Sequence, residues 1–271
     1  MMTNWRDRLW LVNCSARRGL VAALLVASLF PAPGQETNPQ RPGSHRAPTA
    51  EMLPGKGPVQ GGDWFDKVWS QRRAEFRARR ALDRGAIVFL GDSITQGWTD
   101  VEQRFPDWKC ANRGISGDTT RGILFRLHED VLDLAPAAVV LLIGTNDIGL
   151  GGEPEDVADN LCMILQEFQK ANPAMPVVLC KVMPSHASRQ RPAEKIRRLN
   201  SLMAALAQRF PQCHLCDTWT PFADADGNAR VEEFPDFLHP NAAGYAKWAA
   251  VLEPILRGLP RLPRAASDGG T

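Results

Sequence analysis

The amino-acid sequence predicts an α/β fold whose core is a parallel sheet with helices on both faces. Five short apolar runs alternate with longer segments of helical periodicity between residues 87 and 256, which is the pattern of strands joined by helical crossovers. Most of these runs are rich in Val, Ile and Leu, as expected for strands buried on both faces. Polar residues follow the first three runs, which places them at the sheet edge where parallel strands deliver a site.

Length and composition fit one sizeable domain with additional segments. The chain has 271 residues, of which 44% are hydrophobic and 23% are charged, and both fractions are ordinary for a globular protein. The formal net charge of +2 is nearly balanced. We therefore expect neither nucleic acid nor an anionic membrane surface as a partner.

The first 34 residues have the features of an export signal. Arg17 and Arg18 precede an apolar run at 19–30 that fits a signal peptide and is too short to span a bilayer. We predict a signal peptide over residues 1–34, hence a periplasmic or extracellular protein with no membrane span in its mature form. The paired arginines leave both the general and the twin-arginine export routes open. The alternatives are an uncleaved membrane anchor and a misassigned start.

The rest of the chain divides into a linker, one domain and a tail. Residues 35–62 are rich in Pro, Gly, Gln and Thr, which predicts a flexible linker. A folded domain is expected over residues 63–258 and a disordered tail over 259–271. The domain begins with a helix over 63–82, where apolar residues recur at helical spacing beside an arginine-rich solvated face. Strands are expected at 87–90, 109–112, 138–143, 177–181 and 214–217, and helices at 119–132, 155–170, 193–210 and 241–256.

The cysteines and histidines do not predict a metal site. Removing the leader would take Cys14 away from the six cysteines and leave an odd number, so a complete set of internal disulfides is excluded. Cys213 and Cys216 have a metal-like spacing, but no second pair exists, and we predict buried packing for them. His45, His128, His186 and His214 form no cluster with ligand spacing, so we expect no catalytic metal.

Four polar segments stand where a core pattern alone would not require them. They are Gly91-Asp92-Ser93, residues 112–119, residues 144–147 and residues 236–239. The first three follow consecutive strands. Because the carboxyl ends of parallel strands meet at one edge of the sheet, we expect these segments to lie together.

The four segments contain the groups that ester hydrolysis needs. Ser93 is the candidate nucleophile, and His239 is the candidate base because imidazole titrates near neutral pH. Asp236 lies three residues earlier and can hold the ring tautomer. The backbone N–H groups of Ser93 and Gly117 and the side-chain amide of Asn146 are candidate donors to an oxyanion.

The surroundings of Ser93 differ from those in an α/β-hydrolase. The G-x-S-x-G elbow of that fold requires glycine where this chain has Thr95. The short spacing between Asp236 and His239 also differs, since the acid and the histidine of that fold usually come from separate loops.

Several of these residues also have purely structural interpretations. Ser93 could cap the helix that follows it, and His239 could simply begin the last helix. Gly117 could serve only a turn, and Asn146 could bridge loop backbones.

Neighbouring residues have a structural alternative as well. Asp92 and Asp147 fit hydrogen bonding to loop amides better than proton transfer. Trp98 suits either stacking on substrate or the aromatic core, and Arg121 suits either the pocket or a surface ion pair.

Together the four segments resemble, in order, the signature blocks of the SGNH (GDSL) hydrolase superfamily. Residues 117–121 with Arg126 and Leu127, and residues 236–239 with 244–247, are similar to the catalytic subunits of its platelet-activating-factor acetylhydrolase branch. The resemblance covers about residues 63–258. It implies a three-layer, flavodoxin-like α/β/α fold with a five-stranded parallel sheet and a metal-free esterase without a cofactor. It implies the same roles as above for the triad Ser93, His239 and Asp236 and for the oxyanion hole of Ser93, Gly117 and Asn146.

Two departures from that branch affect the expected substrate. The third block has Asp147 where the branch tends to have a second asparagine, a form that resembles bacterial members. The leader and linker are absent from the intracellular animal enzymes, and exported members often resemble carbohydrate acetylesterases.

The sequence therefore predicts an exported serine esterase acting on short acyl esters, acetyl above all, of a small molecule or a glycan. Alternatives are a lysophospholipase or thioesterase for longer chains, an acyltransferase to an acceptor sugar, and a non-catalytic glycan-binding protein. The animal relatives form dimers, so a homodimer is an open expectation.

Overall fold

The computed structural model describes residues 46–260 and 262. Its centre is a five-stranded, all-parallel sheet with the order β2-β1-β3-β4-β5. The strands are β1 (Ile87–Gly91), β2 (Cys110–Gly114), β3 (Ala138–Leu142), β4 (Val177–Cys180) and β5 (Cys213–Cys216). The predicted α/β class and five-stranded parallel sheet are confirmed, and β2 begins one residue later than expected and runs two residues further.

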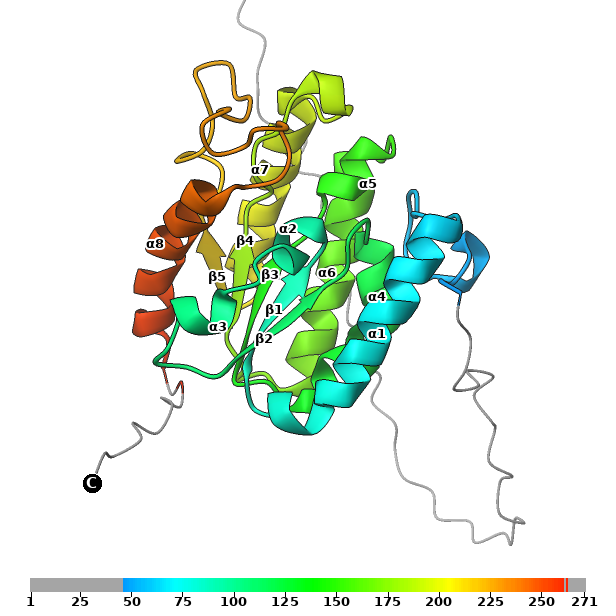
Figure 1. The fold of residues 1–271 in the computed structure, drawn as a ribbon, viewed down its shortest axis with the longest axis vertical. Helices are drawn as coiled ribbons and strands as arrows, with labels where there is room; N and C mark the ends of the chain where they lie inside the picture. Colours follow the sequence, from blue (N-terminus) through cyan, green and yellow to red (C-terminus); the bar gives the residue numbers. More distant parts are fainter. Residues whose placement is uncertain (1–45, 261, 263–271) are drawn as a thin grey trace, which may run out of the picture. The chain divides into compact units, whose positions relative to one another are not determined.

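Helices cover both faces of the sheet because alternate strand residues point to opposite sides. Val88 and Leu90 of β1 belong to the core on one face of the sheet, which is covered by α4 (Thr120–Asp130), α6 (Pro154–Ala171) and α7 (Ala193–Arg209). Ile87 and Phe89 belong to the core on the other face, which is covered by α8 (Ala242–Gly258). The short helices α2 (Ser93–Gln96) and α3 (Val101–Arg104) lie on the α8 side. Figure 1 shows α8 and α3 on one side of the sheet and α4 and α6 on the other. The fold therefore has three layers, α/β/α.

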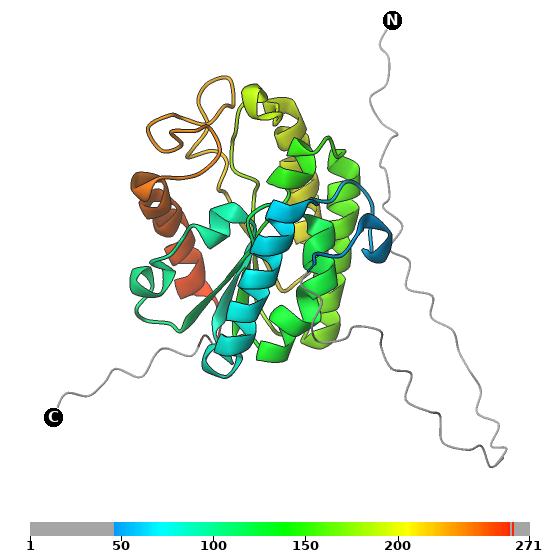
Figure 2. The same cartoon turned by 45° about the vertical axis from the view of Figure 1, so that its right-hand side comes forward.

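The chain enters this domain along its outer edge. Helix α1 (Asp63–Asp83) packs through Phe65, Trp69 and Phe76 against Ile115, just beyond β2. The preceding residues 46–62, here called the strap, contain the 3-10 turn η1 (Ala50–Met52) and lie beside the start of α4 (Figure 2).

The strap corrects the expected boundary at residue 63. Arg121 of α4 donates four hydrogen bonds of 2.6–3.0 Å to strap carbonyls, those of Ala50, Leu53, Pro54 and Gly57. The side chain of Asn160 pairs with the backbone of Lys56 at 2.8 and 2.9 Å. Hydrogen bonds from one arginine to backbone carbonyls require no pattern of apolar residues. The sequence of the strap therefore lacks apolar periodicity, which is why a flexible linker was expected there. The leader at 1–34 and the rest of that linker lie outside the described residues.

Other segments also differ from expectation. The helix α5 (Thr145–Gly149) and the helices α2 and α3 are too short for a periodic signal, as are the turns η2 (Leu132–Leu134) and η3 (Ala187–Arg189). Leu259 and Leu262 pack on the core beneath α8, although they were placed in a disordered tail; residues 261 and 263–271 are not described. No helix among the described residues is long and apolar enough to cross a membrane.

Candidate active site

Ser93 is the first residue of α2 and lies just beyond the carboxyl end of β1. Strand β1 lies between β2 and β3, which is where the order of the strands along the chain reverses. A Cβ on Gly91 would come within 2.3 Å of the carbonyl oxygen of Leu142, so the strand can end this way only with glycine. The carboxylate of Asp92 accepts a hydrogen bond from the N–H of Ile94 at 2.9 Å and caps α2. Asp92 therefore does the capping that Ser93 could have done, and the Ser93 hydroxyl is left to other partners.

The Ser93 hydroxyl faces a histidine and a carboxylate in series. Its Oγ lies 2.9 Å from Nε2 of His239, and Nδ1 of His239 lies 2.8 Å from Oδ2 of Asp236. A carboxylate only accepts hydrogen bonds, so the proton of the neutral ring sits on Nδ1 and the Nε2 lone pair faces Ser93. This is the arrangement in which a histidine can take the proton of a serine.

The same loop holds Asp236 ionised. Partial burial acts to raise its pKa, but hydrogen bonds from the backbone N–H and ring of His239 and from the N–H of Leu238 bring the pKa of Asp236 down to about 2. The His239 and Asp236 side chains keep 45% and 39% of their surface exposed. The His239 and Asp236 side chains are thus accessible to solvent.

The long connection between β5 and α8 carries His239 and is anchored in the core. Phe222 and Phe234 are fully buried and meet edge to face at 5.5 Å. Ser185, beyond β4, donates a hydrogen bond of 2.7 Å to the carbonyl of Phe237, a residue held at φ +60°. These contacts fix the loop position although the loop has little regular structure.

Three segments at the sheet edge meet beside Ser93. The side-chain nitrogen of Asn146 donates to the carbonyl of Asp118 at 3.0 Å, which ties α5 to the loop of Gly117. Oε1 of Gln96 accepts from the N–H of Ser116 at 2.6 Å, which ties that loop to α2. Gly117 has φ +85°, a conformation that favours glycine. Among the described residues no protein group accepts a hydrogen bond from the N–H of Gly117.

Buried carboxylates brace these segments from below. Burial raises the pKa of Asp92 to about 7 and the pKa values of Asp118 and Asp147 to about 6. Asp118 pairs with the fully buried Arg126 at 2.8 Å, and Asp147 accepts from the N–H of Thr120 at 3.1 Å. The structural roles expected for Asp92 and Asp147 are confirmed.

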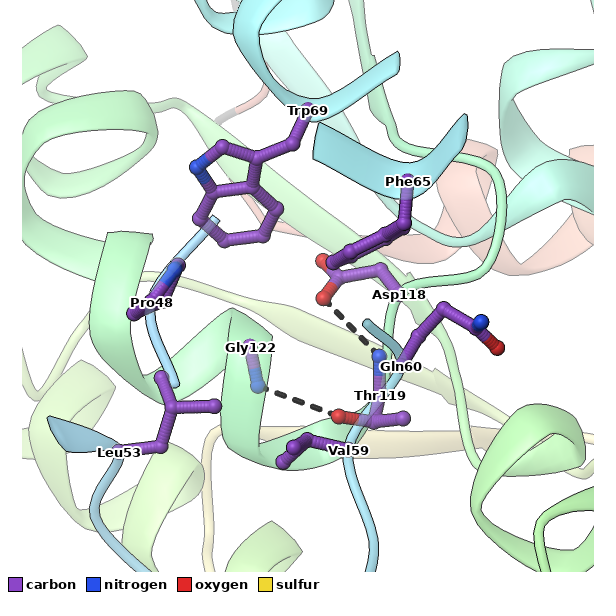
Figure 3. A pocket seen from close by; sticks show the side chains of 9 residues that line it. All are labelled: Pro48, Leu53, Val59, Gln60, Phe65, Trp69, Asp118, Thr119 and Gly122. Carbon is purple, nitrogen blue, oxygen red and sulfur yellow. Dashed lines mark hydrogen bonds between the residues drawn. The ribbon is translucent and has the colours of Figure 1, made fainter. Parts of the chain in front are cut away.

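A small pocket lies behind the Gly117 loop, between the strap, α1 and the start of α4 (Figure 3). Its walls include Phe65 and Trp69 from α1 and Leu53 and Val59 from the strap. At its base the carboxylate of Asp118 accepts from the N–H of Thr119 at 2.9 Å. The strap therefore packs directly against the loop that presents Gly117.

Trp98 and Arg121 were candidates for a substrate pocket from the sequence, but the structure gives each of them another role. Trp98 is 1% exposed and packs against Phe89, Phe105 and Trp248, so it belongs to the aromatic core. Arg121 anchors the strap and makes no ion pair with another described residue. Arg189 and Arg191, which follow β4, contact Asp236 and Asn146 and were missed. Their position after a predicted strand of the sheet was the signal that could have pointed to the site. Arginines are common in loops, however, so position alone does not single these two out.

The described residues contain no group of three or more His, Cys, Asp or Glu side chains placed to hold a metal ion. Cys213 and Cys216 in β5 form no disulfide with another described residue.

Comparison with known proteins identifies the family. The model of the GDSL-like Lipase/Acylhydrolase family matches residues 89–247, more than half of the chain. The chain belongs to the GDSL-like lipase/acylhydrolase family. As an acylhydrolase of this family it is an ester hydrolase.

This GDSL-like acylhydrolase is similar to mammalian proteins. It is 29% identical over 209 residues to the platelet-activating factor acetylhydrolase IB subunit alpha1 of Bos taurus, covering 76% of this chain and 88% of the relative. It is 28% identical over 177 residues to the alpha2 subunit of Homo sapiens, covering 64% and 76%.

Solved structures share its fold. A Streptococcus pneumonia protein described as a platelet activating factor is 27% identical with a TM-score of 0.65, covering 72% of this acylhydrolase and 95% of that chain. The acetyl xylan esterase AlAXEase is 22% identical with a TM-score of 0.54, covering 63% and 98%, and shows the fold alone. These neighbours confirm the fold class.

Proposed function

We propose that the protein is a serine esterase that removes short acyl groups, acetyl above all, through Ser93, His239 and Asp236. The observation that carries the proposal is the unbroken series of contacts of 2.9 and 2.8 Å from the Ser93 hydroxyl through the His239 ring to the Asp236 carboxylate. A serine with a histidine on one side and a histidine-bound carboxylate beyond it is activated for attack on an ester carbonyl.

The reaction proceeds in two halves. His239 takes the Ser93 proton as Oγ bonds to the carbonyl carbon, and the negative charge on the former carbonyl oxygen is stabilised by the N–H groups of Ser93 and Gly117 and the amide of Asn146. His239 then gives its proton to the leaving alcohol as the ester bond breaks. Water, deprotonated by His239, attacks the acyl-enzyme, and the acid leaves as the proton returns to Ser93. Asp236 stays ionised and stabilises the imidazolium.

Three considerations support an acetyl ester on a bulky alcohol such as a sugar. The mammalian relatives include acetylhydrolase subunits at 29% identity, and the solved structures that share the fold include an acetyl xylan esterase. The His239 and Asp236 side chains are 45% and 39% exposed, so an ester of a bulky alcohol could approach them from solvent. The export signal expected at residues 1–34 would bring such an enzyme to extracellular glycans.

Hydrolysis of p-nitrophenyl acetate, p-nitrophenyl octanoate and acetylated xylo-oligosaccharides tests the proposal. We expect acetate to be cleaved faster than octanoate, and Ser93→Ala to lower kcat by about 10⁴-fold or more without changing the fold. Ser201→Ala, a surface hydroxyl on α7, is the matched control and should keep the wild-type rate.

Three results would contradict it. Near-normal turnover by Ser93→Ala would remove the serine mechanism. Preference for octanoate would favour a lysophospholipase or thioesterase, and glycan binding by a folded protein without turnover would favour a non-catalytic role.

A further inference from the structure

The loop between β4 and α7, residues 181–192, contacts both ends of the proposed catalytic machinery. On one side Arg189 donates from Nε to the carbonyl of Asp236 at 2.7 Å, and its Nη2 lies 3.2 Å from Oδ2 of the same residue. On the other side Arg191 donates from Nη2 to Oδ1 of Asn146 at 2.9 Å. One connection thus reaches the acid of the triad and the side-chain donor of the oxyanion site.

The guanidinium of Arg191 is fixed at several points. Its Nε lies 3.0 Å from the carbonyl and 3.1 Å from the hydroxyl of Thr145, and its Nη1 donates to the carbonyl of Arg189 at 2.6 Å. The side chain is half-buried, and it packs where a Cβ on Gly149 would come within 2.7 Å of its guanidinium atoms. A planar fork held this way leaves its Nη2 little freedom to move away from Asn146.

These contacts decide which way the Asn146 amide faces. A guanidinium only donates hydrogen bonds and a backbone carbonyl only accepts them. Arg191 therefore requires the oxygen of the Asn146 amide on its own side, and the carbonyl of Asp118, 3.0 Å from Nδ2, requires the nitrogen on the other. The second hydrogen of Nδ2 has no acceptor among the described residues and remains to bind an oxyanion.

We propose that Arg191 is a positioning residue, which orients the Asn146 amide for oxyanion binding without touching the substrate itself. The proposal rests on the proposed function, because it assigns Arg191 to the same site. Arg191 should therefore favour the transition state and not the bound substrate, since the negative charge on the ester oxygen forms only during the reaction. Loss of Arg191 should therefore lower kcat and leave KM nearly unchanged.

Variants of Arg191 test this in the full enzyme with p-nitrophenyl acetate. Arg191→Met keeps the length of the side chain but removes every donor, and we expect kcat to fall about tenfold with KM within about twofold. The carbonyl of Asp118 still favours the correct amide orientation, so the loss should be smaller than the 10²- to 10³-fold expected for Asn146→Ala. Arg191→Lys, which retains charge and donors, should restore part of kcat and covers the case in which Arg191→Met does not fold. Arg198→Met, an exposed arginine on α7, is the matched control and should keep the wild-type kcat.

The double variant separates positioning from a structural role. If Arg191 acts through Asn146, Arg191→Met should have little further effect on kcat in an Asn146→Ala background. Equal tenfold losses in both backgrounds, or a wild-type kcat in Arg191→Met beside an impaired Asn146→Ala, would overturn this proposal alone. Absence of Ser93-dependent turnover in the wild type would overturn the proposed function and this proposal with it.

Discussion

At the residue scale, the turn of Ser93 rests on a carboxyl group that is costly to ionise. Asp92 is fully buried, one of its oxygens has no hydrogen-bond partner among the residues that the structure describes, and burial raises its pKa to about 7. In the unfolded chain an aspartic acid titrates near pH 4. Between these two pH values the folded protein keeps a proton on Asp92 that the unfolded chain has released. Protonated Asp92 therefore contributes stability at low pH, and this contribution is lost as the pH rises through the pKa of Asp92 in the folded state.

Asp92→Asn should remove this pH dependence. Asparagine has the shape of the protonated acid but does not titrate, so the unfolding free energy of the wild type should fall relative to that of the variant by about 1 kcal/mol per pH unit between about pH 5 and 7. Denaturant unfolding of both proteins at several pH values measures the difference. The charges of Asp118 and Asp147 also raise the pKa of Asp92, so the difference between the two curves reports the titration of Asp92 together with its coupling to these two carboxyl groups. Parallel curves would show that Asp92 does not titrate in this range.

The sequence was sufficient to name the residues that meet at the candidate site but not those that position them. Ser93, Gly117 and Asn146 follow strand ends, and His239 lies near Asp236, so chemistry and order along the chain point to them. Arg191 is different. Its contact with Asn146 joins residues 45 positions apart and depends on the path of a loop that has no sequence pattern.

At the scale of the element, the strap depends on one side chain. Arg121→Ala should leave the carbonyls of Ala50, Leu53, Pro54 and Gly57 without their charged donor and lower the unfolding free energy by about 2–4 kcal/mol. Limited proteolysis should then cut faster within residues 46–62. Arg77→Ala, on the exposed face of α1, is the control and should behave as the wild type. An unchanged cleavage pattern and stability in Arg121→Ala would mean that α1 and Asn160 hold the strap unaided.

The sequence predicted those helices and strands in which apolar residues recur at a regular spacing. The five strands and the helices α1, α4, α6, α7 and α8 were found within a few residues at their ends. The strap, α5 and the loop after β4 were not, because polar contacts fix them. Arg121 and Arg191 each bind carbonyl oxygens from distant segments, and such bonds leave no periodic trace.

At the scale of the whole molecule, the described domain has its own core on both faces of the sheet, and the segment predicted to be an export signal precedes it in sequence. We expect the full chain, expressed in a bacterial host, to accumulate in the periplasm or medium, and a chain lacking residues 1–34 to remain in the cytoplasm with the same esterase rate. Cell fractionation and activity of each fraction measure this. Equal cytoplasmic retention of both chains would contradict the predicted signal peptide.

The spacing of the triad along the chain also sets when the site can form. Asp236 and His239 are three positions apart, whereas Ser93 and His239 are 146 positions apart. The serine follows the first strand and the histidine lies in the loop before the last helix, so their contact joins the start of the sheet to the segment that follows its last strand. During synthesis the emerging polypeptide cannot join them until His239 has left the ribosome. Hydrolysis should therefore arise as one of the final events of folding, and nascent fragments that end before residue 239 should be inert.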